Sequence, residues 1–315
     1  MAVYTKLSNT EIADFLSLYD LPQLAKASGI LSGISNTNYL LELTDDTKLI
    51  LTLFEQNIDE QELPFFIELI DHLAARQIPC PKPIRSKKGA AIATLGGKSA
   101  TMVSFLQGGG IDKIENQHIA ELGTAIAKMH LAGQQYTGKL ENRFALDFCK
   151  DLIGKIGTRS DIISTSLSQE LAQEIEFLQN NPVQDLPSGI IHADLFPDNV
   201  LFDDSGKLTG IIDFYFACNG FFAYDLAIII NAWCFDELVF NNQKAEILIN
   251  SYCEVRQLSK QELQAMPTLL RAASLRFLSS RLYDNLFPVA DATLTPKDPL
   301  EYLAKLRFHR NNYHL

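Results

Sequence analysis

The sequence contains few of the residues that mark several common protein classes. Its 5 cysteines, in 315 residues, are scattered without any C-x-x-C pair, which excludes zinc ribbons and disulfide-bonded scaffolds. The longest apolar runs, such as Ala227–Ala232, fall far short of the roughly 20 residues that a membrane-spanning helix needs. Residues Met1–Lys6 lack a basic segment followed by an apolar one, so we expect no secretory signal. An odd, dispersed set of thiols favours reduced cysteines and a cytoplasmic location.

Basic residues are also scarce. The chain has 27 Lys and Arg against 38 Asp and Glu, a formal net charge of −11 at pH 7. Binding to nucleic acids or anionic membranes depends on neutralising phosphates with Lys and Arg, so we expect neither partner. The remaining composition, 47% hydrophobic and 21% charged, is that of an ordinary globular protein. Its length exceeds the roughly 100–200 residues of a typical domain and predicts two lobes or domains.

The first 105 residues have the pattern of a small, mostly antiparallel sheet with one packed helix. Ser8 and Glu11 have the spacing of a capping box and predict a short helix that stops before Pro22. Alternating apolar segments bounded by turn residues predict two hairpins. The predicted strands are Tyr39–Leu43, Leu49–Phe54, Ala91–Thr94 and Ser99–Phe105, and a helix is expected at about 61–76.

The glycine run Gln107–Gly110 reads as a connection between two parts of the chain. Beyond it, helical patterns dominate, at about 116–132, 145–156, 168–180, 222–234, 242–255, 260–287 and 298–313. Short strands at Gly189–His192, Asn199–Asp203 and Leu208–Phe214 interrupt them. The sequence therefore predicts an α+β fold of two lobes, an antiparallel β-rich N-lobe (1–105) and a mainly helical C-lobe (106–315), and leaves the oligomeric state open.

Two motifs within this strand-containing insert carry the chemistry. Residues 192–199 match H-x-D-x-x-x-x-N, and residues 211–214 read I-I-D-F after a hairpin. Phosphoryl transfer needs a carboxylate to accept the proton of the attacking hydroxyl, and a carboxylate with an amide oxygen to hold Mg²⁺ against the nucleotide phosphates. Asp194 suits the first role, and Asn199 and Asp213 suit the second. The motifs therefore predict phosphotransferase chemistry with ATP and Mg²⁺.

Each motif taken alone has an ordinary structural explanation. A single His-x-Asp is compatible with a turn, and Asp198 with a plain loop residue. The full order of strand, H-x-D-x-x-x-x-N, hairpin and I-I-D-F is hard to obtain by chance and favours catalysis. His192 is a second catalytic candidate, as a base, although a structural hydrogen-bonding role suits it better. We expect Asp225, in A-Y-D-L-A, to brace the catalytic loop by accepting hydrogen bonds, and Trp233 to belong to the core.

The paired motifs, late in a two-lobe chain, resemble those of the aminoglycoside-phosphotransferase-like kinases. Within that group the chain is most similar to the bacterial homoserine kinases. The matching stretches are spread over most of the chain and are Gly33–Tyr39, Leu51–Glu55, Glu62–Phe66, Ile78–Pro81 and Arg281–Asp284. The resemblance implies a protein-kinase-like fold, with an N-lobe that binds ATP, a C-lobe that carries the catalytic loop, and an amino-acid substrate, homoserine.

The nucleotide site is expected in the N-lobe. Backbone N–H groups of Ser32–Asn38 are suited to cover phosphates, with Gly33 allowing close approach. The candidate nucleotide-binding residues are Gly33, Ser35, Asn36, Asn38 and Thr52. Gly96–Ser99 superficially matches the end of a Walker A motif, but the position of its first glycine is Ile92 and no helix follows, so we predict a hairpin there.

Thr52 is a departure from the wider superfamily, which has at that position a strand lysine that pairs with the α- and β-phosphates. Lys48 shares the strand parity of Thr52 but lies roughly 13 Å away, at ~3.3 Å per residue. The homoserine-kinase branch shares the sequence L-T-L-F-E, so the threonine is interpreted as a trait of that subgroup. Neutralisation of the phosphates remains partly unexplained.

A zwitterionic substrate needs a cation for its carboxylate. Arg271, Arg276 and Arg281 recur every five residues, which spreads them around a helix, so at most two can face a substrate. Arg281 is the preferred candidate because a guanidinium binds a carboxylate through two parallel hydrogen bonds. Two alternatives stay open: a kinase for an aminoglycoside, choline or a thiosugar, and a nucleotide-binding regulator without catalysis, which Thr52 suggests.

Overall fold

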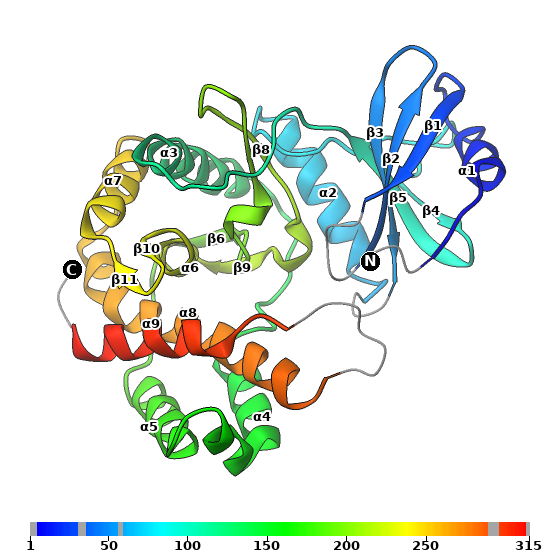
Figure 1. Ribbon diagram of the computed structural model, residues 1–315. Coiled ribbons are helices and arrows are strands. Elements are labelled where there is room, and N and C mark those ends of the chain that lie inside the picture. The colour runs from blue at the N-terminus through cyan, green and yellow to red at the C-terminus, as the bar shows by residue number, and fades with distance from the viewer. Residues whose placement is uncertain (1–4, 31–35, 56–58, 289–295, 313–315) are drawn as a thin grey trace.

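The computed structural model describes residues 5–30, 36–55, 59–288 and 296–312. They form two lobes, a small one built on a sheet and a larger helical one, as predicted (Figure 1). Among the described residues, none of the helices combines the length and the apolar character needed to cross a bilayer.

The small lobe contains a five-stranded antiparallel sheet in the order β1-β2-β3-β5-β4. Its strands are β1 (Leu24–Gly29), β2 (Asn36–Leu43), β3 (Lys48–Phe54), β4 (Ile92–Leu95) and β5 (Lys98–Ser104). Both predicted hairpins are confirmed. The turn between β4 and β5 uses Gly96 and Gly97 at φ angles of 58° and 76°, which glycine adopts without strain. The segment Gly96–Ser99 is therefore a hairpin, as expected.

The two faces of this sheet have different partners. The predicted first helix is confirmed as α1 (Asn9–Leu16), and its Ser8–Glu11 capping box is formed. Ile12 of α1 joins Leu41 and Leu51 in a fully buried cluster on the outer face. Because side chains alternate along a strand, the residues between them on β2 and β3 point to the opposite face, toward the larger lobe.

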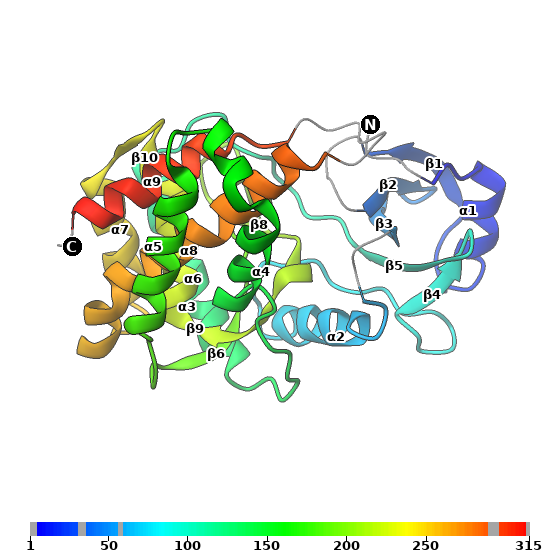
Figure 2. The ribbon, with the colours of Figure 1, turned by 90° about the horizontal axis from the view of Figure 1, so that it is seen from below.

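Helix α2 (Leu63–Ala74) connects the lobes, and Figure 2 shows it lying between the sheet and the helical lobe. Its buried side chains, such as Ile67 and Leu73, belong to the same hydrophobic cluster as the core of the larger lobe. The predicted connection also contacts the larger lobe, because Gly109 exchanges two backbone hydrogen bonds of 2.9 Å with Phe202. At Gly108, where φ is 110°, a Cβ atom would lie 2.3 Å from Oγ1 of Thr209, so only glycine fits this close approach.

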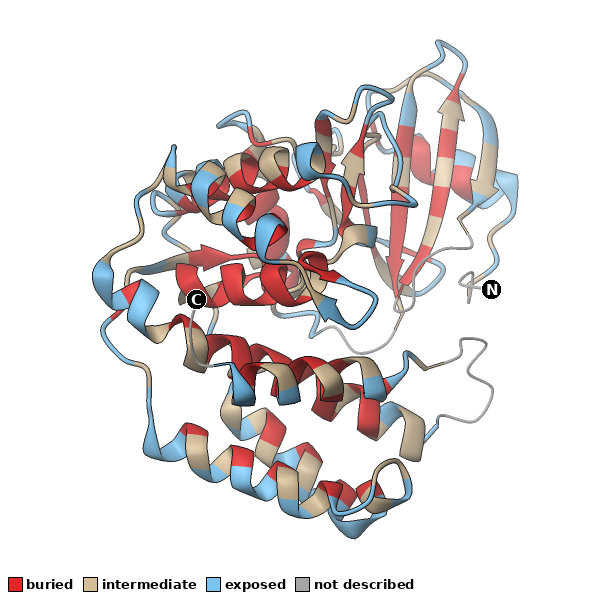
Figure 3. Ribbon diagram, turned by 60° about the vertical axis from the view of Figure 1, so that its left-hand side comes forward, coloured by how far each residue is buried: buried red, intermediate tan, exposed pale blue. Residues whose placement is uncertain are grey.

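The larger lobe confirms every helix that the periodicity predicts. They are α3 (Asn116–Gly133), α4 (Leu146–Ile156), α5 (Leu167–Asn180), α6 (Phe222–Trp233), α7 (Asn242–Cys253), α8 (Lys260–Leu286) and α9 (Pro299–Asn311). Helix α6 is buried along nearly its whole length, including Trp233, and packs against α8. Figure 3 shows the buried central helices surrounded by outer helices with exposed faces.

Two short strand pairs interrupt the helices. The predicted strands are confirmed as β6 (Ser188–Ile191), β7 (Val200–Phe202) and β8 (Leu208–Ile211), and β7 pairs with β8. A further strand, β9 (Cys218–Phe221), was not predicted and pairs antiparallel with β6. Strand β6 leads into the H-x-D-x-x-x-x-N motif and β9 leads into α6, so their pairing places the start of α6 under that motif. A small hairpin, β10 (Phe235–Asp236) and β11 (Val239–Phe240), follows α6.

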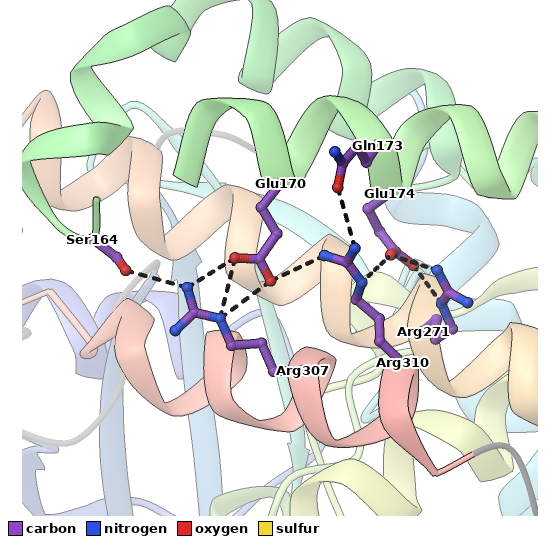
Figure 4. A network of polar contacts seen from close by, with 7 residues as sticks. All are labelled: Ser164, Glu170, Gln173, Glu174, Arg271, Arg307 and Arg310. Atoms are coloured by element: carbon purple, nitrogen blue, oxygen red, sulfur yellow. Dashed lines mark hydrogen bonds and ion pairs between the residues drawn. The ribbon is translucent and has the colours of Figure 1, made fainter. Parts of the chain in front are cut away.

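An ion-pair network fixes α9 to the helices beside it (Figure 4). Arg307 and Arg310 of α9 both hydrogen-bond to Glu170 of α5, at 2.8 and 3.0 Å. Arg271 of α8 makes two hydrogen bonds of 2.7 Å to Glu174, also on α5, which is fully buried. Helices α5, α8 and α9 are thus held together by charge-assisted hydrogen bonds.

Candidate active site

The catalytic loop, residues 192–199, is held from below by Asp225. Asp225 lies in the first turn of α6, is completely buried, and accepts hydrogen bonds from the backbone N–H groups of His192 at 2.9 Å and Ala193 at 2.8 Å. Ala193 has a φ of 62°, in the left-handed region that costs a non-glycine residue roughly 1–2 kcal/mol. The predicted bracing role of Asp225 is confirmed, and it stabilises a strained turn immediately before Asp194.

Asp225 is itself held by His130 of α3. The ring Nε2 of His130 lies 3.0 Å from Oδ2 of Asp225, and Nδ1 lies 2.8 Å from the hydroxyl of Tyr252. Burial works in the opposite direction, but the hydrogen bond and charge of His130 keep the pKa of Asp225 below its usual range. The carboxylate therefore stays ionised and accepts all its hydrogen bonds.

Asn199 and Asp194 are fixed against each other. The Nδ2 of Asn199 donates to the backbone oxygen of Asp194 at 2.7 Å and to the carboxylate oxygen Oδ2 at 3.3 Å. Because these contacts use the amide nitrogen, Oδ1 of Asn199 is the atom left to coordinate a cation. This orientation suits the metal-binding role predicted for Asn199.

Asp213 lies beside the catalytic loop, as the motif spacing predicts. Its φ of 64° turns the chain sharply after β8. Surrounding protein, and then the like charges of Asp194 and Asp198, raise the pKa of Asp213 to about 7, although its side chain is open to solvent. Carboxylates that repel one another in this way would be stabilised by a divalent cation.

The donor set is suited to magnesium, which prefers oxygen ligands and takes few of them from the protein. Among the described residues, no group of three or more His, Cys, Asp or Glu side chains could enclose a metal ion. One carboxylate and one amide oxygen leave most positions around a metal ion open, so Asn199 and Asp213 would hold Mg²⁺ together with phosphate or water oxygens. This is the arrangement that a nucleotide-bound magnesium ion requires.

His192 ties the catalytic loop to the segment that carries Asp213. Its Nε2 donates to the backbone oxygen of Ile212 at 2.9 Å, and its ring packs against Phe214 at 4.7 Å between centroids. The side chain is completely buried, and burial lowers its pKa, so the ring is neutral. A ring without access to solvent cannot reach a substrate, which argues against the catalytic candidacy of His192 and fits the structural alternative.

The predicted nucleotide-binding residues that the structure describes share one face of the sheet. Oγ1 of Thr52 donates to Oδ1 of Asn38 on the neighbouring strand at 2.7 Å. Asn36, two residues before Asn38, is buried, and its Oδ1 has no hydrogen-bond partner among the described residues. A buried oxygen without a partner is costly, so this face is prepared for a donor from a ligand. Gly33 and Ser35 lie outside the described residues.

The position of the missing strand lysine is occupied by a neutral cluster. The hydroxyl of Tyr215 is within hydrogen-bonding reach of Thr52, and its ring makes edge contacts with Phe54 of β3 and Phe66 of α2. Tyr215 therefore links the sheet to the segment of Asp213, two residues earlier. No motif in the sequence points to Tyr215, and the one signal that marks it is the aromatic run F-Y-F directly after Asp213.

Each of the three arginines of α8 is already hydrogen-bonded to another group of the protein. Arg271 is bound to Glu174, as above, and Arg276 is buried and donates to the backbone oxygen of Ala193. Arg281 donates to the backbone oxygen of Asp298 at 3.0 Å and to Glu301 at 2.6 Å. Because these partners already satisfy Arg281, the expectation that it binds the substrate carboxylate is not supported by its placement.

One exposed cation does lie beside the catalytic loop. Lys297 is 3.4 Å from Asp198, with its ammonium group 5.0 Å from the centre of the Phe196 ring. Burial raises the pKa of Asp194, and the positive charges of Arg276 and Lys297 oppose that shift. No sequence pattern pointed to Lys297, which lies 99 residues from Asp198 along the chain.

Residues 26–252 match the model of the phosphotransferase enzyme family. The chain is 46% identical over 311 residues to a homoserine kinase of Rhodospirillum rubrum, covering 98% of this chain and 96% of that one. It is 45% identical to a homoserine kinase of Agrobacterium fabrum with the same coverage.

Solved structures share the fold at much lower identity. An amicoumacin kinase, solved in complex with AMP-PNP and Ca²⁺, superposes with a TM-score of 0.69 at 14% identity, covering 97% of this chain and 92% of that chain. An aminoglycoside phosphotransferase from Alicyclobacillus acidocaldarius gives a TM-score of 0.69 at 13% identity, covering 98% and 93%. The chain therefore belongs to the phosphotransferase enzyme family and, within it, to the homoserine kinases.

Proposed function

We propose that this chain transfers the γ-phosphoryl group of ATP to the side-chain hydroxyl of L-homoserine, with Mg²⁺ as the metal. The observation that carries the proposal is the near full-length identity of 45–46% to homoserine kinases. The convergence of Asp194, Asn199 and Asp213 at one site supports it, because that chemistry needs these groups together.

Asp194 accepts the proton of the substrate hydroxyl. Burial raises the pKa of its carboxyl group, which makes it a better proton acceptor than an ordinary aspartate. The nearby charges of Arg276 and Lys297 oppose this shift and favour the ionised form. The hydrogen bond from Asn199 to Oδ2 fixes the direction of the carboxylate toward its substrate.

Asn199 and Asp213 would hold the magnesium ion, through Oδ1 and the carboxylate respectively. When bound, the ion supplies positive charge that neutralises the phosphate oxygens. From the small lobe, Asn36, Asn38 and Thr52 would present the polar face of the sheet to the nucleotide. Oδ1 of Asn36, for which the described part of the chain offers no hydrogen-bond donor, supports this assignment.

A coupled assay of ADP release tests the proposal. We expect Mg²⁺-dependent turnover with L-homoserine and little with choline, an aminoglycoside or a thiosugar. The variant Asp194→Asn should keep its affinity for ATP and lose kcat by roughly 10²–10⁴-fold, because an amide cannot accept the proton. Turnover of another acceptor in place of homoserine would refute the substrate. Bound ATP without turnover of any acceptor would favour a regulator.

We expect this reaction to take place in the cytoplasm. All five cysteines are free, and Cys80, Cys149, Cys218 and Cys234 are buried. Burial raises the pKa of the Cys80 and Cys234 thiols to about 12, so they stay protonated and unreactive. Thiols kept in this form are compatible with a reducing compartment.

A further inference from the structure

Recognition of homoserine poses an electrostatic problem that the groups described so far leave open. The amino acid carries an ammonium and a carboxylate on one carbon atom, and its carboxylate must approach ATP, which is polyanionic. A site that selects this zwitterion needs a cation and an anion close together, near Asp194. Arg276 and Arg281 are committed to Ala193, Asp298 and Glu301 and cannot supply that cation.

Lys297 and Asp198 have the required charges and position. They form an ion pair of 3.4 Å whose side chains are 48% and 67% exposed. Asp198 lies on the catalytic loop between Asp194 and Asn199, and the ammonium of Lys297 lies over Phe196 of the same loop. The ion pair therefore places one positive and one negative charge beside Asp194, the residue that would receive the hydroxyl proton.

The backbone under Lys297 is fixed from several sides. The backbone oxygen of Lys297 accepts a hydrogen bond of 3.0 Å from Asn285 of α8, and the next residue, Asp298, accepts one from Arg281. Asp298 also caps α9 through its contact with the N–H group of Leu300. Helix α9 is in turn bound to α5 by the network of Figure 4. The lysine thus projects from an anchored segment while its ammonium group stays accessible.

The ion pair is easily opened. Exposed ion pairs contribute little to stability, because water competes for both charges. A ligand that offers a carboxylate to Lys297 and an ammonium to Asp198 replaces one weak contact by two complementary ones. The buried pairs of the lobe do not offer this exchange: Arg271 and Glu174, for example, are only 7% and 0% exposed.

We propose that the Lys297–Asp198 ion pair is the recognition site for the amino-acid end of the substrate, with Lys297 binding the carboxylate and Asp198 binding the ammonium. The inference rests on the proposed homoserine kinase activity and assigns two specificity-determining residues to it. Asp194 then receives the hydroxyl at the other end of the same short molecule.

The test compares homoserine with 3-aminopropan-1-ol, which keeps the hydroxyl and the ammonium but lacks the carboxylate. In Lys297→Met we expect KM for homoserine to rise roughly tenfold or more, since a lost charge-assisted hydrogen bond costs about 1.5–3 kcal/mol. KM for ATP should stay within twofold, and kcat/KM for 3-aminopropan-1-ol should not fall. Lys297→Arg should recover most of the affinity for homoserine.

In Asp198→Asn, kcat/KM should fall for both acceptors, because both carry the ammonium, while the Mg²⁺ concentration for half-maximal rate changes far less than in Asp213→Ala. Lys128→Met, an exposed lysine of α3, is the control and should leave all constants unchanged. An unchanged KM for homoserine in Lys297→Met, or a larger rise in KM for ATP, would overturn the inference even though homoserine is turned over. Wild-type enzyme that does not phosphorylate homoserine would instead refute the proposed function.

Discussion

The hydrogen bonds between Asp225 and the catalytic loop allow a quantitative prediction. Asp225 is fully buried and accepts hydrogen bonds from the backbone of His192 and Ala193 and from the ring of His130. Asp225→Asn preserves shape but provides one acceptor oxygen and an amide group that donates. The amide then faces at least one N–H group, which leaves a buried donor unpaired and removes the charge that strengthened the other bonds.

The magnitude follows from these contacts. A buried donor left unpaired costs about 1–3 kcal/mol, and more where the lost acceptor was charged, so with several donors affected we expect a loss of about 3–5 kcal/mol in the free energy of unfolding. The entropy of unfolding, about 2.1 cal/mol/K per residue, converts this loss into a decrease of roughly 5–8 °C in Tm for a chain of this length. The strained φ of Ala193 is no longer held, so the loop relaxes and Asp194 shifts. Misplacement by about 1 Å can reduce the rate 10²-fold, and we expect kcat to fall by that order.

Thermal unfolding and steady-state kinetics at 25 °C, well below the expected Tm, measure the two effects separately. The matched control is Asn231→Ala, also on α6 and fully buried, whose amide donates to Leu270 and Ser274 of α8, at 3.0 and 3.1 Å, and not to the catalytic loop. It should lower Tm without a comparable loss of kcat. If Asp225→Asn lowers Tm but keeps kcat within threefold of wild type, Asp225 stabilises the fold and does not position Asp194.

Two further predictions concern charge. Asp213→Ala should weaken Mg²⁺-dependent ATP binding more than Asn199→Ala, because a carboxylate neutralises the charge of the ion and an amide only coordinates it. Mg²⁺ titrations of the two variants measure this difference. Equal, mild effects would mean that the metal binds elsewhere. Burial, and then Lys305 and Arg271, lower the pKa of His309 from 6.5 to about 4, so the unfolded chain takes up its proton first as pH falls. Stability should therefore decrease by about 2 kcal/mol between pH 7 and pH 5, and urea unfolding should show that His309→Gln loses this part of the decrease.

The elements that could be predicted from the sequence are those with local signals. The α1 capping box, the Gly96-Gly97 turn and the long apolar periodicities specify structure through neighbours in the chain. Strand β1 escaped prediction because Leu24–Gly29 lacks alternation and β-branched residues, and forms by pairing with β2 at the sheet edge. Strand β9 contains only Cys-Asn-Gly-Phe and forms because β6 lies beside it.

The site residues divide in the same way, into those with a local sequence signal and those placed by tertiary packing. Asp194, Asn199 and Asp213 were predictable because two short motifs joined by one hairpin bring them together. Arg281 was chosen from the chemistry of carboxylate recognition, but periodicity along a helix does not reveal which partner already occupies a side chain. Lys297 reaches the catalytic loop only through the packing of α9 on α8, which no local pattern records.

The threonine in place of a strand lysine has a consequence for how the two lobes cooperate. On the face of the sheet toward the larger lobe, Asn38, Thr52 and Tyr215 form a neutral cluster, so this part of the nucleotide site contributes hydrogen bonds and little charge. Most of the phosphate charge must then be neutralised from the side of Asp213, by the metal it would hold. Tyr215 joins both sides: it follows Asp213 by two residues and packs against Phe54. We therefore expect nucleotide binding to the sheet and the placement of Asp213 to be mechanically linked in this chain.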